Sequence, residues 1–252
     1  MKMQNAEMKC PEMILFDYGQ TLTAEPEWDG LRGTRALMRH AVSNPRGLAP
    51  EEVSAYAGEL HAQVCAPLHE LRREMHEWQF MRLLYGLLQI EFSIPVQEQE
   101  RVFYAAAIRT VPMPHVEELL DFLDARGIRK GVVSNIMSSG QQLRGRIGQN
   151  LPRHAFEFVL ASSDCGVSKP DPLIYRLAIA KAGMDPADIC FCGDNPLCDV
   201  EGPHAAGLQA VWYEDLTLDF LWRDPARVPP RCPHLHIHDW RELINILKEL
   251  SP

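Results

Sequence analysis

Short apolar segments recur along the chain, each long enough for a strand but too short for a complete helix. Five of them predict buried strands, at residues 13–16, 128–133, 156–160, 189–192 and 208–212. Between them, residues 116–126 and 172–182 place apolar side chains on one helix face, and a glycine follows each segment as a stop signal. Strands that alternate with helices favour an α/β fold built on a parallel sheet.

The segment that follows the first strand has a different pattern. Apolar residues return at helical spacing in residues 53–64 and 80–88, and no strand-like alternation is visible. Proline and glycine residues divide the segment into about four helices. The predicted organisation is therefore a core of residues 1–22 and 110–252, with a helical domain of residues 23–109 inserted after the first strand.

Polar residues lie at or just beyond the ends of three predicted strands. Asp17 follows the first strand, Ser134 the second and Asp194 the fourth. Parallel α/β sheets bind their ligands beyond the carboxyl ends of the strands, so these residues are expected to share one edge. That coincidence is the first indication of a functional site.

Composition mainly excludes classes of function. Of the 252 residues, 46% are hydrophobic and 23% charged, as in an ordinary globular protein. The net charge is −9 without a basic cluster, so nucleic acid is not an expected partner. No apolar segment approaches the length of a membrane span, and residues 13–16 are too few for the core of a signal peptide. The sequence leaves open whether the protein is a monomer or a homodimer.

Cysteine usage favours a reducing compartment. The seven cysteines are scattered, odd in number and never spaced as C-x-x-C. This pattern argues against both a disulfide framework and a zinc ribbon. We therefore expect the protein in the cytoplasm.

Four segments occur in an order and spacing that resemble the haloacid dehalogenase-like (HAD) superfamily. They are residues 14–22, 132–135, 166–172 and 192–200, the last continuing to Gly207. Singly, each is also typical of a turn or a helix cap, but the ordered set at strand ends favours the family. The resemblance extends from about residue 12 to 250. It implies a Rossmann-like core with a helical cap of the C1 type, inserted after the first strand.

The resemblance also implies roles for individual residues. Asp17 would be the nucleophile that accepts a phosphoryl group as an aspartyl-phosphate. Ser134 and Asn135 would bind phosphoryl oxygens, and Lys169 would hold both the phosphate and the nucleophile by charge. The implied Mg²⁺ ligands are Asp17, the backbone carbonyl of Gly19, Asp194 and Asp199, the last directly or through water. The expected activity is Mg²⁺-dependent hydrolysis of a small phosphorylated metabolite.

One position departs from the family pattern. Most phosphatases of the family carry a second Asp two residues after the nucleophile, as general acid and base, and this chain has Gly19 there. Such assistance is typically worth ~10²–10⁴-fold in rate. One explanation is a phosphatase that is slow or restricted to good leaving groups, with water, Gln20 or a cap side chain replacing the acid. The second is a catalytically quiet protein that still binds metal and phosphate.

Two other chemistries of the family fit less well. Phosphonate cleavage needs a cap lysine, and the chain has no Lys between Lys9 and Lys130. Haloacid dehalogenation uses no metal and lacks the acidic fourth motif, whereas Asp194 and Asp199 are both present. We therefore rank a phosphatase-like hydrolase first, a quiet binder second and a dehalogenase third.

Three histidines alternate near the C-terminus, at His234, His236 and His238. Alternate residues of a strand share a face, so three imidazoles at this spacing can gather a metal ion. The other interpretation, which we favour, is an edge strand with a polar solvent face.

Overall fold

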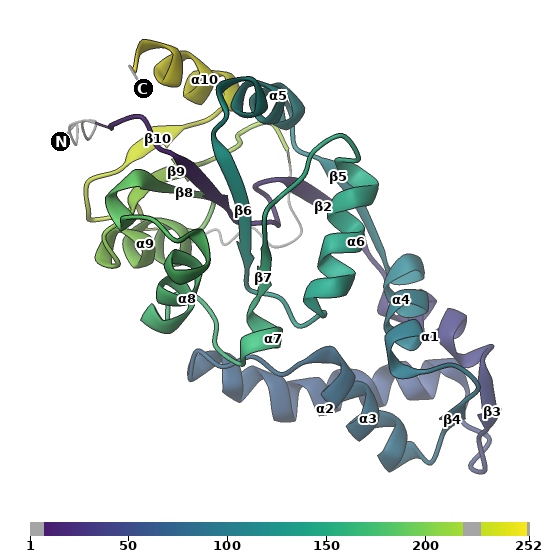
Figure 1. Cartoon of the computed structure of the whole chain (residues 1–252). Coiled ribbons are helices and arrows are strands. Elements are labelled where there is room, and N and C mark those ends of the chain that lie inside the picture. The colour runs from purple at the N-terminus through teal and green to yellow at the C-terminus, as the bar shows by residue number, and fades with distance from the viewer. Residues whose placement is uncertain (1–7, 219–227, 251–252) are drawn as a thin grey trace.

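A six-stranded parallel sheet forms the centre of the protein (Figure 1). The computed structural model describes residues 8–218 and 228–250. The strands of this sheet are β1 (Met13–Phe16), β6 (Arg129–Ser134), β7 (Val159–Ala161), β8 (Ile189–Gly193), β9 (Gln209–Tyr213) and β10 (Leu235–Ile237). Their order across the sheet is β10-β9-β8-β1-β6-β7, so β1 lies in the middle and pairs with β6 and β8. The α/β class and the parallel sheet are confirmed.

Helices cover both faces of this sheet. They are α5 (Val116–Arg126), α6 (Gly140–Asn150), α7 (Ser162–Cys165), α8 (Pro172–Ala182), α9 (Gly202–Ala205) and α10 (Trp240–Glu249), with the short turns η1 (Pro186–Asp188) and η2 (Pro196–Glu201). Gly127 and Gly183, at φ +68° and +67°, end α5 and α8 in the left-handed conformation that glycine adopts without strain. The expected helix ends are therefore confirmed.

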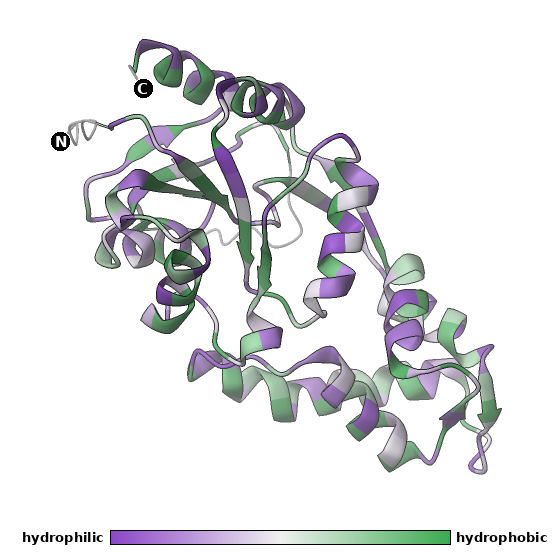
Figure 2. Ribbon diagram, viewed as in Figure 1, coloured by the Kyte–Doolittle hydropathy of each residue, from purple (hydrophilic) through white to green (hydrophobic). Residues whose placement is uncertain are grey.

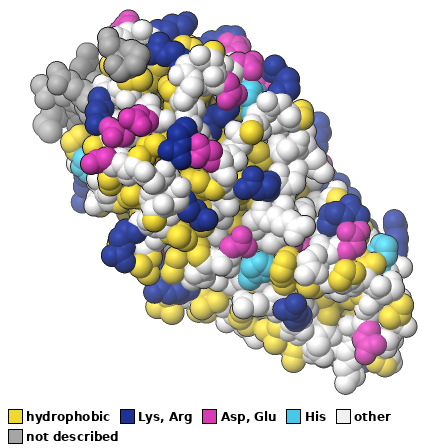
Figure 3. Space-filling view, in the orientation of Figure 1, with side chains coloured by type: hydrophobic (Ala, Val, Ile, Leu, Met, Phe, Trp, Pro, Cys, Tyr) yellow, Lys and Arg dark blue, Asp and Glu magenta, His cyan; other side chains and the backbone are white. Residues whose placement is uncertain are grey.

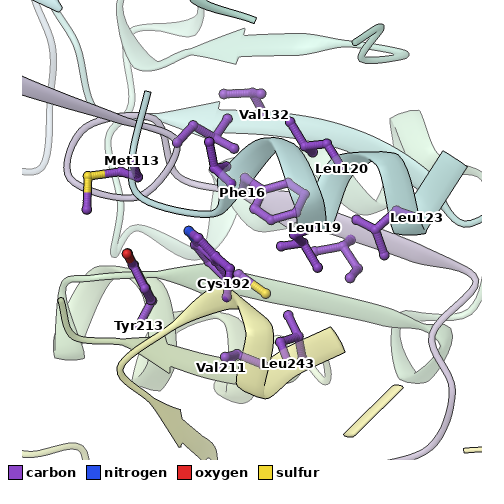
Figure 4. Packing of buried hydrophobic residues seen from close by; sticks show 14 of the residues in the cluster. Phe16, Met113, Leu119, Leu120, Leu123, Val132, Cys192, Val211, Tyr213 and Leu243 are labelled. Atoms are coloured by element: carbon purple, nitrogen blue, oxygen red, sulfur yellow. The ribbon is translucent and has the colours of Figure 1, made fainter. Parts of the chain in front are cut away.

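The alternation of side chains along β1 builds two hydrophobic layers. Ile14 and Phe16 face α5 and α10, where Leu119, Leu120 and Leu243 complete one cluster (Figure 4). Met13 and Leu15 face the opposite layer, which includes α8. All four β1 residues are fully buried, and the strands of the sheet are among the most hydrophobic parts of the ribbon in Figure 2. Burial on both faces is what makes β1 a continuous apolar run.

A helical domain lies at one end of the sheet (Figure 1). Its helices are α1 (Gly30–Met38), α2 (Pro50–Glu70), α3 (Glu77–Leu88) and α4 (Val96–Ala107), the four that the sequence predicts. They share a hydrophobic core of their own. The expected stripe of residues 80–88 is only partly buried, since Leu83 and Leu87 are 38% and 48% exposed. Hydrophobic side chains reach the surface over this domain (Figure 3).

Two antiparallel strand pairs within or beside the helical domain were not expected. They are β2 (Thr23–Trp28) with β5 (Ile108–Pro112), and β3 (Ala41–Ser43) with β4 (Glu91–Phe92). Pro26 lies inside β2, where the pairing shifts register, and a proline within an apolar run obscures the strand pattern. β2 leads from the central sheet into the helical domain and β5 leads back, so this strand pair connects the two parts. The predicted limits at residues 23 and 109 fall at the start of β2 and within β5.

The third predicted strand is the least accurate. Residues 156–160 were expected, whereas β7 covers residues 159–161. Phe156 and Phe158 are nevertheless buried, at 7% and 8% exposure, because they pack against the core just before the strand begins. Within residues 8–218 and 228–250, no helix is both long and apolar enough to cross a membrane. Residues 1–7, part of the predicted core, lie outside the described residues.

Candidate active site

Three adjacent strand ends form the floor of the site. Asp17 follows β1, Ser134 is the last residue of β6, and Asp194 follows β8 directly. Because β1 pairs with both of the other strands, these residues meet at one edge of the sheet. The Asp17 backbone N–H donates to the Cys192 carbonyl at 2.9 Å, which continues the β1–β8 pairing up to Asp17.

Lys169 brings a positive charge to the same edge. It lies in the loop between α7 and α8, and its ammonium donates to Oδ1 of Asp17 and to Oδ1 of Asp199, each at 2.7 Å. The side chain is buried, and burial alone lowers the pKa of a lysine. The charges of Asp17 and Asp199 outweigh burial and raise the pKa of Lys169, so the ammonium stays charged.

Asp199 is placed for this contact by the turn η2. Its Oδ2 accepts the Asn195 backbone N–H at 2.9 Å, while its Oδ1 accepts from Lys169. A Cβ at Gly193 would lie 2.5 Å from Asp199 Oδ2, closer than non-bonded atoms approach. The glycine before Asp194 is therefore required by the position of the Asp199 carboxylate.

Asn135 holds the lysine loop. Its side-chain amide donates to the Lys169 carbonyl at 2.8 Å, and its Oδ1 accepts the Lys169 backbone N–H at 2.7 Å. This two-point contact occupies both ends of the amide. The expectation that Asn135 binds phosphate stays a prediction, and the side chain has a positioning role that sequence reasoning did not assign.

Asp17, Asp194 and Asp199 form an acidic cluster. One carboxylate oxygen from each lies within 4.8 Å of the others. Burial raises the pKa of Asp17, and the negative charge of Asp199 adds to this rise while Lys169 opposes it. Three carboxylates that converge at one edge of the sheet can bind a divalent cation. An all-oxygen donor set fits Mg²⁺, so the residues present are those that this ion prefers.

The loop after Asp17 leaves space where the family's second Asp would stand. A Cβ built on Gly19 has no heavy atom within 4 Å outside its chain neighbours. Gln20 follows with φ +58°, a left-handed conformation uncommon for a residue with a side chain. Gln20 is half-buried, and its buried Oε1 has no hydrogen-bond partner among the described residues. Thr21 is fully buried, consistent with a role in shaping the loop.

A cavity of about 640 Å³ lies between the helical domain and the core. Asn135 borders it, next to Ser134 at the strand edge. Its other walls include the aromatic residues Trp28, Phe80, Phe103 and Tyr104 and the charged residues Glu77 and Arg146. A mostly apolar cavity with a few charged groups is typical of a small-molecule site.

Buried polar contacts join the helical domain to the core beside this cavity. Glu100 of α4 accepts from the Ser139 backbone N–H at 2.6 Å, from its hydroxyl at 2.7 Å and from the Trp78 indole at 2.7 Å. Glu77 accepts from the Tyr104 hydroxyl at 2.8 Å. Sequence reasoning missed these residues, because an acid near a helix start is ordinarily a solvated residue that favours the helix dipole.

Arg146 connects three parts of the structure. Its guanidinium lies 5.4 Å from the ring of Tyr18, the residue after Asp17, and 5.2 Å from the Tyr104 ring of α4. It also donates to the Ser138 hydroxyl at 2.9 Å and lies 3.6 Å from Glu25. The arginine is 5% exposed and packs between the two rings, so it fixes the position of the helical domain relative to the loop that follows Asp17.

Comparison with known proteins gives one family. The profile of the haloacid dehalogenase-like hydrolases matches residues 11–207. A phosphoserine phosphatase of Thermus thermophilus is 32% identical over 147 residues, which are 58% of this chain and 55% of that protein. The haloacid dehalogenase-like hydrolase domain-containing protein 3 of Homo sapiens is 33% identical over 156 residues, 60% of this chain and 61% of that protein. The chain thus matches a little over half the length of these relatives.

Solved structures share the fold. A 2-haloacid dehalogenase from Pseudomonas syringae pv. Tomato DC3000 superposes with a TM-score of 0.61 at 22% identity, covering 96% of this chain and 98% of that chain. At this identity the similarity shows the fold alone, and the chemistry has to be argued from the site.

Proposed function

The chain belongs to the haloacid dehalogenase-like hydrolases, and on that premise we propose that it is a Mg²⁺-dependent phosphatase of small phosphorylated metabolites. The observation that carries the proposal is the pair of 2.7 Å contacts from Lys169 to Asp17 and Asp199, within reach of Asp194. A nucleophilic carboxylate, a fixed cation and an acidic metal site meet at one sheet edge. These are the parts that phosphoryl transfer requires.

In the proposed reaction Asp17 attacks the phosphorus of the substrate. A bond forms between its carboxylate oxygen and phosphorus while the bond to the leaving oxygen breaks, giving an aspartyl-phosphate and an alkoxide or phenoxide, which takes a proton from water. Lys169 stabilises the negative charge of the phosphoryl oxygens, and Ser134 donates a hydrogen bond to one of them. When bound by Asp17, Asp194 and Asp199, Mg²⁺ supplies further neutralisation of that charge. Water then releases phosphate and regenerates Asp17.

Gly19 has no side chain that could act as acid or base, and this limits the substrates that we propose. Without a carboxyl there, the departing oxygen receives no proton from that position, so esters with good leaving groups are favoured. Gln20 is a candidate to position the hydrolytic water, because its buried Oε1 lacks a protein partner among the described residues. The aromatic walls of the cavity suit a leaving group with an apolar body.

Gly19 also keeps a second function open, a quiet protein that binds metal and phosphate without turnover. The dehalogenase alternative is less favoured, since the acidic cluster that includes Asp194 and Asp199 suits a metal-dependent reaction. The Lys169 ammonium is buried between Asp17 and Asp199, and burial of such charged groups costs stability. A protein that only bound metal and phosphate would have little need of this arrangement, so it supports the phosphatase over the quiet binder.

Hydrolysis of an aryl phosphate and of a panel of metabolite phosphates, with Mg²⁺ and with chelator, tests the proposal. Phosphate release that requires Mg²⁺ and is abolished in Asp17→Asn is the expected result. Release no greater than the Asp17→Asn background on every ester, despite measurable Mg²⁺ binding, would favour the quiet binder.

A further inference from the structure

Glu214, His236 and His238 form a second cluster of metal-binding side chains, at the β10 edge of the sheet. One donor atom from each residue lies within 4.8 Å of the others. In the parallel register, His236 pairs with Trp212 and Ile237 with Tyr213. The Glu214 backbone N–H donates to the Ile237 carbonyl at 2.9 Å, which extends the pairing and brings Glu214 beside His238.

The side chains of this cluster are held in position by their neighbours. His236 stacks on the Trp212 ring with centroids 4.0 Å apart and planes at 13°, and its Nε2 lies 3.1 Å from Glu214 Oε2. His238 Nδ1 lies 2.9 Å from the Glu214 carbonyl oxygen. A carbonyl only accepts, so Nδ1 carries the proton and Nε2 keeps its lone pair. This arrangement is the one by which outer hydrogen bonds orient metal-binding histidines.

His234 does not belong to the cluster. Its Nδ1 lies 2.8 Å from the Cys232 carbonyl oxygen, and the third side chain of the cluster is that of Glu214. The favoured interpretation, an edge strand with a polar face, is confirmed, because β10 lies at the edge of the sheet and His236 is exposed. The alternative set of three histidines is not the set that the structure brings together. Glu214 was not recognised because it directly follows β9, distant in sequence and adjacent only through the parallel pairing.

We propose that Glu214, His236 and His238 bind one divalent transition-metal ion of the Zn²⁺ type, at a site separate from the acidic cluster. Two imidazoles and one carboxylate suit Zn²⁺, Ni²⁺ or Cu²⁺, whereas Mg²⁺ prefers oxygen donors alone. The His236 and His238 side chains are 34% and 44% exposed, so an ion can enter and retain water. Trp212 lies between the two sites, since its ring stacks on His236 and its indole N–H donates to the Asp194 carbonyl at 3.1 Å.

Zn²⁺ binding to the full chain, measured by competition with a chromophoric chelator, tests this site. Saturating Mg²⁺ occupies the acidic cluster, and a thiol reductant keeps the cysteines reduced. The wild type is expected to bind one equivalent of Zn²⁺. His236→Ala and His238→Ala are each expected to weaken that binding by about 10-fold or more, because each removes a ligand.

His234→Ala is the matched control, since it removes a histidine of the same segment that lies outside the cluster. It should bind Zn²⁺ like the wild type. Equal loss in all three histidine variants, unchanged binding in His236→Ala and His238→Ala, or no Zn²⁺ bound by the wild type would overturn the proposal. If His236→Ala fails to fold because it loses the Trp212 stack, His238→Ala and Glu214→Gln carry the test. None of these variants replaces a residue of the Asp17 site, so phosphatase activity is a separate readout.

Discussion

The ammonium of Lys169 lies 2.7 Å from the carboxylate of Asp17, although 152 residues separate them along the chain. Three groups hold this contact in place. Asn135 fixes the backbone of the lysine, Asp199 accepts a second hydrogen bond from the ammonium, and the β1–β8 pairing positions Asp17. The site around the proposed nucleophile thus combines residues from three strand ends and one loop, and the contact depends on all of them.

Removal of the Lys169 charge should disable the site without unfolding the protein. Lys169→Met is expected to lower kcat for an aryl phosphate by about 10²- to 10³-fold, since a fixed charge stabilises the transition state. Lys181→Met, at an exposed position of the neighbouring helix α8, is the control and should keep full activity. Steady-state kinetics on both variants is the measurement, and equal activity of the two would contradict the role of Lys169.

Restoring a carboxyl at position 19 should supply the missing acid. The space around Gly19 accepts a side chain, so Gly19→Asp is expected to fold normally. It should raise kcat/KM toward alkyl phosphates by about 10²-fold, with a smaller gain for an aryl phosphate, whose leaving group needs less protonation. Gly19→Asn has the same size but no transferable proton. A gain of the same size in Gly19→Asn would show that proton transfer is not the cause.

A methyl group added at position 193 should displace the side chain of Asp199. Gly193→Ala forces the Asp199 carboxylate away from its place, so both stability and activity should fall. The expected loss in unfolding free energy is about 1–3 kcal/mol, the usual cost of overpacking. Gly86→Ala in α3, where a Cβ meets nothing within 4 Å, is the control and should raise stability by up to about 1 kcal/mol. Urea unfolding and phosphate release measure both effects, and an unaffected Gly193→Ala would contradict the packing argument.

Glu77 should make stability depend on pH. Burial raises the pKa of Glu77 from its ordinary value of 4.5 to about 7, with the Tyr104 hydrogen bond opposing the rise. The folded state therefore holds this proton more tightly than the unfolded state, and the stability it contributes is lost as the pH rises from about 4.5 through 7. As the pH rises through this window, the free energy of unfolding of Glu77→Gln should increase by up to about 3 kcal/mol relative to that of the wild type.

Urea unfolding at about pH 5 and about pH 8 measures this difference. Glu70→Gln, at the exposed end of α2, is the control and should follow the wild type at both values. A Glu77→Gln variant whose stability relative to the wild type is the same at both values would refute the assignment.

The sequence predicted the sheet edge well because buried parallel strands are apolar on both faces and end at chemically distinct residues. Met13–Phe16 stands out for this reason, and Asp17 marks its end. Lys169 was assigned through the family resemblance, because its loop has no local signal for where the side chain goes. Its contact with Asp199 follows from the backbone of η2, which no residue pattern specified.

The buried acids of the helical domain and the second metal cluster depend on contacts between distant segments. Glu100 resembles any surface glutamate in sequence, and only the docking of α4 against Ser139 buries it. Glu214 gains its histidine neighbours through strand pairing alone. Such residues carry no periodicity or spacing of their own, so tertiary structure was needed to find them.

Trapping of a phosphoryl-enzyme tests the central claim most directly. Radiolabelled aryl phosphate is mixed with the protein and Mg²⁺, the reaction is quenched in acid within the first turnover, and the label on protein is counted. Because Gly19 provides no base for the second step, the aspartyl-phosphate on Asp17 should accumulate and be seen as protein-bound label, absent in Asp17→Asn and with chelator. Label that persists in Asp17→Asn, or phosphate release from the wild type without any protein-bound label, would contradict Asp17 as the nucleophile.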